Sequence, residues 1–129
     1  MNTTDVSKRE DIELMVNEFY SKVRKDDVLG GIFEDIIQDR WPEHLEKMYR
    51  FWETVLLNNH TYHGSPFLPH AKLPIGKDQF DRWLELFVET ICENFNGKVA
   101  DEAKWRAEKM AEMFQFKINH LQNIQKTEL

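Results

Sequence analysis

A single histidine, His70, lies in a short connector that contains three of the four prolines of the chain. The connector, Ser65 to Pro74, reads SPFLPHAKLP. Prolines fix the backbone φ angle and prevent a long helix from running through the segment, so the imidazole is held on a stiff element. A histidine held in this way between apolar residues suits a fixed metal ligand. The other interpretation is a histidine that is hydrogen-bonded to a neighbouring carbonyl group.

Three further side chains, Tyr20, His44 and Trp83, bring hydrogen-bond donors to helical faces that otherwise carry Phe, Met, Leu and Ile. A buried donor without a partner costs roughly 1–3 kcal/mol. Three such donors on converging apolar faces therefore indicate a bound ligand whose polar atoms they share. An apolar slot with one imidazole beneath and several donors opposite is the arrangement that a haem needs. The alternative is that these three residues are ordinary core and interface residues.

The elements that must position these side chains follow from apolar residues spaced three and four apart, which is typical of helices with one buried face. The predicted segments are a helix from a capping box at residues 7–10 to the Gly30-Gly31 pair, a short helix over residues 32–38, a helix from Trp41-Pro42 to Leu57, a helix after Gly76 that closes at Gly97, and a last helix with Asp101 as its N-cap. No segment shows sustained period-two alternation, so the predicted fold class is all-α.

Length and composition exclude several classes of protein. A chain of 129 residues suits one domain, and no apolar run approaches the ~20 residues of a membrane helix. The formal net charge of −6 argues against a nucleic-acid partner, because phosphate binding uses clustered Lys and Arg. The N-terminal residues lack an apolar signal core, so we expect a cytoplasmic protein without membrane contact. The single cysteine, Cys92, excludes an internal disulfide and is predicted to be packed in the core.

At the level of motifs, the chain resembles a known family over nearly its whole length. The residues that carry the resemblance are Phe19-Tyr20, Val23 to Asp26, Leu29 to Phe33, Trp41 to His44, Phe51-Trp52, Tyr62 to Pro66, His70, Leu73-Pro74 and Phe80 to Phe87. Together they resemble a truncated haemoglobin, most closely the group III branch. The resemblance implies a single globin domain over residues 1–129, with a shortened globin fold. In that fold the B and E helices pack over the G and H helices as a two-over-two sandwich.

The resemblance also implies a cofactor, haem b, and a role for individual residues. His70 would be the proximal ligand of the iron, and Tyr20, His44 and Trp83 would lie on the distal side, where small ligands bind. Lys47 would pair with a haem propionate. The remaining residues expected in the haem pocket are Phe33, Met48, Phe51 and Leu73.

The function implied by the resemblance is the binding of O2, CO and NO at a five-coordinate ferrous iron. Donors from Tyr20 and Trp83 would slow the loss of O2, which makes simple oxygen delivery a poor fit. Such a pocket suits redox chemistry, for example detoxification of NO or reduction of peroxide, with electrons from an unknown external reductase.

Three other interpretations stay open from the sequence. The chain would be a cofactor-free helical interaction module if its inward donors were ordinary core residues. It would be a gas sensor if a partner protein read the ligand state. His60, His63 and His70 are also close enough in sequence to imitate a three-imidazole zinc site, although no carboxylate or thiol completes it at a usual spacing.

Overall fold

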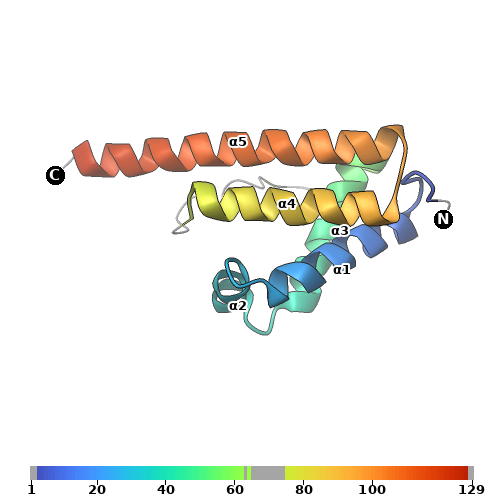
Figure 1. Cartoon of the computed structure of the whole chain (residues 1–129), viewed down its shortest axis with the longest axis horizontal. Helices are drawn as coiled ribbons and strands as arrows, with labels where there is room; N and C mark the ends of the chain where they lie inside the picture. The colour runs from blue at the N-terminus through green and yellow to red at the C-terminus, as the bar shows by residue number, and fades with distance from the viewer. Residues whose placement is uncertain (1–2, 63, 65–74, 128–129) are drawn as a thin grey trace.

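The computed structural model describes residues 3–62, 64 and 75–127, and of these the side chains as far as residue 121. Within this part of the chain lie α1 (Arg9–Lys25), α2 (Gly30–Ile37), α3 (Trp41–Leu57), α4 (Lys77–Asn94) and α5 (Lys98–Thr127) (Figure 1). The described residues form no β-strand and only an isolated parallel bridge between Thr4 and Phe95. The predicted all-α class is confirmed.

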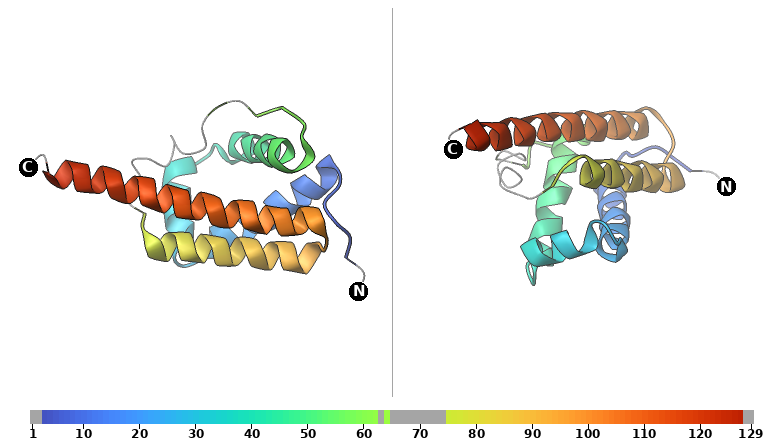
Figure 2. Two further views of the ribbon diagram at one scale, coloured as in Figure 1. Left: turned by 90° about the horizontal axis from the view of Figure 1, so that it is seen from above. Right: turned by 60° about the vertical axis from the view of Figure 1, so that its left-hand side comes forward.

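The helices form two layers. Helices α4 and α5 lie side by side in one layer, and α1 and α3 form the other, crossing them at a steep angle (Figure 2). The short α2 packs against α1 at the edge of the second layer. With α1 and α3 in the places of the B and E helices and α4 and α5 in those of G and H, the two-over-two arrangement expected from the sequence is confirmed.

The cap at the start of α1 and the residue at which α1 ends both differ from the prediction. The carboxylate of Asp11, not of Glu10, accepts hydrogen bonds from the backbone N–H groups of Ser7 and Lys8 at 2.9 and 3.2 Å. The helix ends at Lys25, so the predicted stop at the glycine pair is wrong. Gly30 instead opens α2, where an added Cβ would lie 2.9 Å from a backbone oxygen of α1. The close approach of two helices explains this glycine better than a helix stop does.

Helix α3 has the predicted bounds because its signals are local. Pro42 lies in its first turn, and Asn58 follows its last residue in the left-handed region with φ of 61°.

The start of α5 was predicted wrongly. It begins at Lys98, three residues before Asp101, and the carboxylate of Asp5 accepts hydrogen bonds from the backbone N–H groups of Val99 and Ala100 at 3.0 and 2.8 Å. The cap therefore comes from the N-terminal segment.

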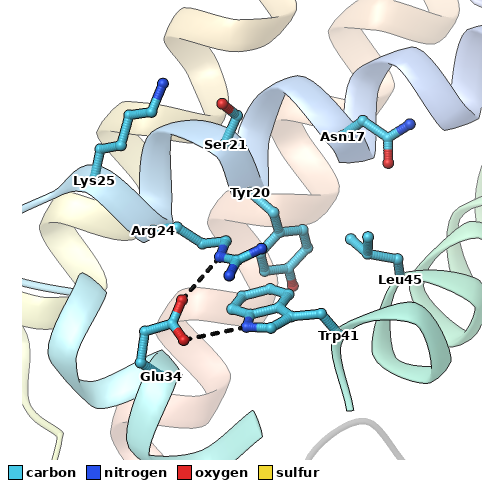
Figure 3. Close-up of a pocket in the computed structure, with 8 residues that line it drawn as sticks. All are labelled: Asn17, Tyr20, Ser21, Arg24, Lys25, Glu34, Trp41 and Leu45. Carbon is cyan, nitrogen blue, oxygen red and sulfur yellow. Dashed lines mark hydrogen bonds and ion pairs between the residues drawn. The ribbon is translucent and has the colours of Figure 1, made fainter. Parts of the chain in front are cut away.

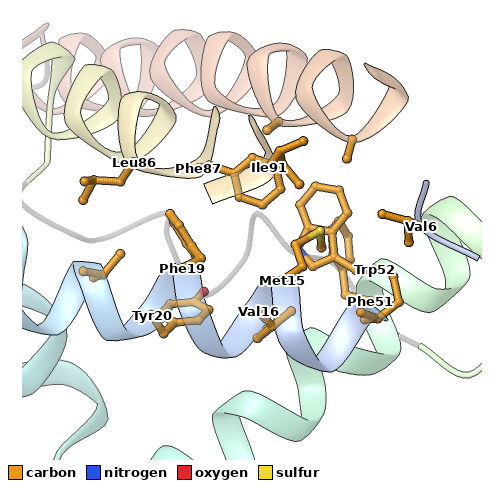
Figure 4. Packing of buried hydrophobic residues seen from close by; sticks show 14 of the residues in the cluster. Val6, Met15, Val16, Phe19, Tyr20, Phe51, Trp52, Leu86, Phe87 and Ile91 are labelled. Carbon is orange, nitrogen blue, oxygen red and sulfur yellow. The ribbon is translucent and has the colours of Figure 1, made fainter. Parts of the chain in front are cut away.

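Aromatic side chains fill the space between the layers (Figure 4). Phe87 of α4 is 1% exposed and lies at the centre. Its ring stacks on Trp52 of α3 at 5.0 Å and meets Phe19 of α1 edge to face at 5.3 Å.

Cys92 was predicted to be in the core, and this prediction is wrong, because Cys92 is exposed on α4. None of the described helices is long and apolar enough to cross a membrane.

Candidate functional site

The Tyr20 side chain is the centre of an aromatic cage built by three helices. Tyr20 comes from α1 and is 8% exposed. Its ring meets Phe33 of α2 at 5.9 Å, and Trp41 and His44 of α3 at 5.8 and 5.0 Å, all edge to face. Edge-to-face contacts place positive ring edges on negative ring faces, which favours this arrangement over parallel stacking. Two of the predicted distal residues, Tyr20 and His44, and the predicted pocket residue Phe33 are therefore brought together.

The hydroxyl of Tyr20 has no hydrogen-bond partner among the described residues, although the side chain is buried. Burial raises the pKa of Tyr20 well above its ordinary value, because the phenolate would be poorly solvated in the cage. The group therefore stays protonated at every physiological pH. It is a neutral O–H donor held inside the protein.

His44 lies one helical turn into α3, and its ring is fixed between two aromatic neighbours. It contacts the edges of Tyr20 at 5.0 Å and Trp41 at 5.7 Å. The side chain as a whole is half-buried, and its Nε2 atom is shielded from solvent. The sequence predicted that His44 faces inward, and the ring does lie against the core.

Trp83 of α4 reaches the same region from the opposite layer. Its indole stacks on Phe87 at 5.7 Å and meets Phe19 edge to face at 5.6 Å. Phe19 also contacts Tyr20 at 4.9 Å, so one phenyl ring touches both predicted donors. The structure thus places Trp83 and Tyr20 on two sides of Phe19, at the junction of α1 and α4.

The predicted apolar wall lies along α3. Met48 is half-buried and packs against the core, and Phe51 is buried against Trp52 at 5.2 Å and Tyr62 at 5.4 Å. The sequence analysis gave Tyr62 no role in the pocket. Phe51 therefore lies at the end of α3 away from Tyr20, with its own aromatic partners.

Lys47 is exposed on α3 and borders a small pocket of about 160 Å³. The lining residues are Ile36, Ile37, Arg40, Glu43, His44 and Lys47. Two cationic side chains, Arg40 and Lys47, therefore lie at the mouth of a pocket that reaches His44. Lys47 and Arg40 thus bring positive charge, and Glu43 negative charge, to the pocket that His44 also lines.

Two predicted residues, His70 and Leu73, lie outside the described part of the chain, as does His63. His60 is exposed, and the described residues contain no group of three His, Cys, Asp or Glu that could hold a metal ion. His120 is exposed on α5.

Sequence reasoning gave no site role to Trp41 or to Arg24 and Glu34, the two residues that hold it. The guanidinium of Arg24 lies 4.4 Å from the centre of the Trp41 ring, and its Nε donates to Glu34 at 2.8 Å. The indole N–H of Trp41 donates to the other oxygen of Glu34 at 3.5 Å (Figure 3). A signal was present, because Arg24 follows Tyr20 by four residues and Trp41 precedes His44 by three, which places each pair on one helix face.

Comparison with known proteins agrees with this architecture. A family model described as bacterial-like globin matches residues 5–120. The group 3 truncated hemoglobin ctb of Campylobacter jejuni is 36% identical over 111 residues, which are 83% of this chain and 87% of that protein. A crystal structure of the group III truncated hemoglobin from Campylobacter jejuni matches with a TM-score of 0.82 at 33% identity, covering 91% of this chain and 95% of the other. The chain therefore belongs to the bacterial-like globins as a group III truncated haemoglobin, in a family that binds small gases at a haem.

Proposed function

We propose that this protein binds haem b through His70 and retains O2 tightly on the face lined by Tyr20, His44 and Trp83, with CO and NO as further ligands. When bound, the haem supplies an iron with an open coordination position for a diatomic ligand. The chain supplies the donors, the apolar walls and the exclusion of water.

The observation that carries the proposal is the Tyr20 hydroxyl. It is a protonated donor in a buried aromatic cage, with no acceptor among the described residues. A largely buried donor of this kind has no hydrogen bond to the described residues that offsets its loss of water. A small electron-rich ligand in the pocket is the acceptor that the cage lacks, so the described side chains fit the distal face of a haem.

Trp83 is the second donor in the proposal. Its indole N–H comes from the α4 side, while the Tyr20 hydroxyl comes from α1, and both rings are fixed against Phe19. If each donor contributes about 1.5 kcal/mol, the pair slows the loss of O2 about a hundredfold. Slow loss favours a reaction of the retained ligand over oxygen delivery.

The other side chains have supporting roles in the proposal. Phe33, Met48 and Phe51, together with Leu73, form the apolar walls. His44 lies where it restricts access from the small pocket, and Lys47 pairs with a propionate at the pocket mouth. For turnover we propose NO detoxification or peroxide reduction in the cytoplasm, with electrons from a separate reductase.

The test begins with the visible spectrum of the purified protein. We expect one haem per chain and a Soret band. In His70→Ala we expect loss of haem or an altered ferrous spectrum that added imidazole partly restores, because the substitution leaves a cavity of the shape of the ligand. His120→Ala is the matched control, since His120 is exposed on α5.

Two results would count against the proposal. A purified protein that takes up no haem would favour the cofactor-free interaction module. An unchanged haem content and spectrum in His70→Ala would remove His70 from the iron while leaving the family assignment intact.

A further inference from the structure

Trp41 contacts both polar residues of the aromatic cage. Its ring meets Tyr20 at 5.8 Å and His44 at 5.7 Å, both edge to face, and Trp41 is 6% exposed. Trp41 is also the first residue of α3, at the end of the helix that faces α1 and α2. Its ring is therefore the structural link between the donor on α1 and the imidazole on α3.

Two charged residues hold the Trp41 ring from the outside. Arg24 of α1 covers one face of the indole at 4.4 Å, within the range of a cation–π contact. Glu34 of α2 accepts hydrogen bonds from the Nε of Arg24 and from the indole N–H. The three residues come from three helices, so together they fix where α2 and the start of α3 lie relative to α1.

A pocket lies directly outside this group. It has a volume of about 500 Å³, and its lining includes Tyr20, Arg24, Glu34, Trp41 and Leu45 (Figure 3). Tyr20 itself lines this pocket, and the Trp41 ring and the Arg24 guanidinium lie in front of its ring and cover part of it (Figure 3). Without the flat ring, more of the Tyr20 side chain would face the pocket, and water would compete as an acceptor for its hydroxyl.

We propose that Trp41 is a positioning residue for the distal pair, Tyr20 and His44. It acts through them by fixing both rings and by limiting the access of water from the outer pocket to Tyr20. Arg24 and Glu34 hold Trp41 in its place. This inference rests on the proposed function, because the pair has a ligand to position only when haem is bound.

The experiment uses the haem-loaded ferrous protein with CO and O2 as probes. Trp41→Leu keeps an apolar side chain but removes the flat ring, whereas Trp41→Phe keeps a flat aromatic ring and removes the N–H with the five-membered ring that carries it. We expect Trp41→Leu to release O2 about tenfold faster, as for the loss of one hydrogen bond. We expect Trp41→Phe to stay within about threefold of the wild type, because its ring still covers Tyr20.

Two spectroscopic readouts test positioning apart from ligand kinetics. A donor aimed at the ligand lowers the C–O stretching frequency, so we expect this frequency to rise in Trp41→Leu and to return in Trp41→Phe. In protein labelled at the tyrosine ring carbons, the NMR signal of Tyr20, assigned by its loss in Tyr20→Phe, should shift in Trp41→Leu.

The matched control is Trp105→Leu. Trp105 also carries an arginine over its ring, Arg106 at 5.6 Å, but it lies on the outer face of α5 and is 52% exposed. We expect all three readouts to stay at their wild-type values in this variant. A change equal to that of Trp41→Leu would overturn the inference.

A double-mutant cycle decides whether Trp41 acts through Tyr20. In a Tyr20→Phe background the hydroxyl is already absent, so Trp41→Leu should change the O2 release rate less than twofold. Fully additive effects would overturn the inference.

If Trp41→Leu does not fold, Glu34→Gln serves instead, because it removes only the charge that holds Arg24. It should raise the C–O frequency at low salt, and an unchanged frequency would overturn the inference.

Failure of this inference differs from failure of the proposed function. If Tyr20→Phe changes the release rate and the Trp41 variants do not, Trp41 has no positioning role and the proposed function stands. If the wild-type protein takes up no haem, the proposed function and the inference fall together.

Discussion

The substitution Tyr20→Phe should change stability and ligand retention in opposite directions. It removes one oxygen atom and keeps the ring, whose edge-to-face contacts with Phe19, Phe33, Trp41 and His44 span 4.9–5.9 Å between centroids. The hydroxyl has no hydrogen-bond partner among the described residues, so its removal breaks no bond within that part of the protein. The usual cost of Tyr→Phe at a bonded site is therefore absent here.

The expected magnitudes follow from the burial of this hydroxyl. Without a ligand, this largely buried hydroxyl makes no hydrogen bond to the described residues. Its loss should therefore raise the unfolding free energy of the haem-free protein by up to about 1 kcal/mol, less than the full cost of a donor completely shielded from water. With a ligand, the same donor contributes about 1.4 kcal/mol, so O2 should dissociate about tenfold faster. A group that lowers stability and strengthens binding is typical of a functional site.

Urea unfolding of the haem-free protein and stopped-flow O2 dissociation measure the two effects. Tyr49→Phe is the matched control, because the Tyr49 hydroxyl is hydrogen-bonded to Asn17 and lies on the outer part of α3. We expect that variant to lose a little stability and to keep the wild-type dissociation rate. The reasoning is refuted if Tyr20→Phe unfolds at clearly lower urea than the wild type, or if it releases O2 at the wild-type rate.

Two more predictions concern charged groups. Burial opposes the charge of Asp26, but hydrogen bonds from Arg82 at 2.6 Å and from two backbone N–H groups outweigh it and lower its pKa below 3.8. The stabilisation by ionised Asp26 is fully present above pH 3.8, the ordinary pKa of the unfolded chain, and is lost as pH falls through the lower pKa of the folded state. Urea titrations should therefore show that Asp26→Asn is less stable than the wild type by ~1 kcal/mol at pH 7, and that the difference shrinks below pH 3.8. Lys47→Glu should speed haem loss severalfold at low salt and less at high salt, because a partly exposed pair is weak and screened. Transfer of haem to an acceptor globin measures this rate, and equal rates at low salt would exclude the propionate pair.

Features that depend on neighbours in sequence were predicted well. The bounds of α3 agree with the structure, because a proline in the first turn and an asparagine in the left-handed region act on the backbone of their own helix. Tyr20, His44 and Trp83 were singled out because each places a donor on an apolar helical stripe, and that pattern is also local. The family was identified from residue motifs, and the comparisons confirm it. The roles of His70 and Leu73 stay predictions, since both lie outside the described residues.

The features that the sequence did not reveal depend on how the two layers of helices meet. Asp5 caps α5 from 94 residues away, because the N-terminal segment runs beside the start of that helix, and no local rule names such a partner. Cys92 has the spacing of a core residue and is nevertheless exposed on α4, so helical spacing alone did not decide its burial.

The arrangement of the cage was also decided only by the tertiary structure. Residue types and helical spacing determined that Tyr20 and His44 face inward, since the side a residue occupies on a helix follows from 3.6 residues per turn. Which ring touches which depends on the crossing of α1 over α3 and on the placement of α2. That crossing brings Trp41 against both residues, and α2 supplies Glu34 to hold it. The sequence by itself thus determined the helices and the donors, and packing between helices decided their partners.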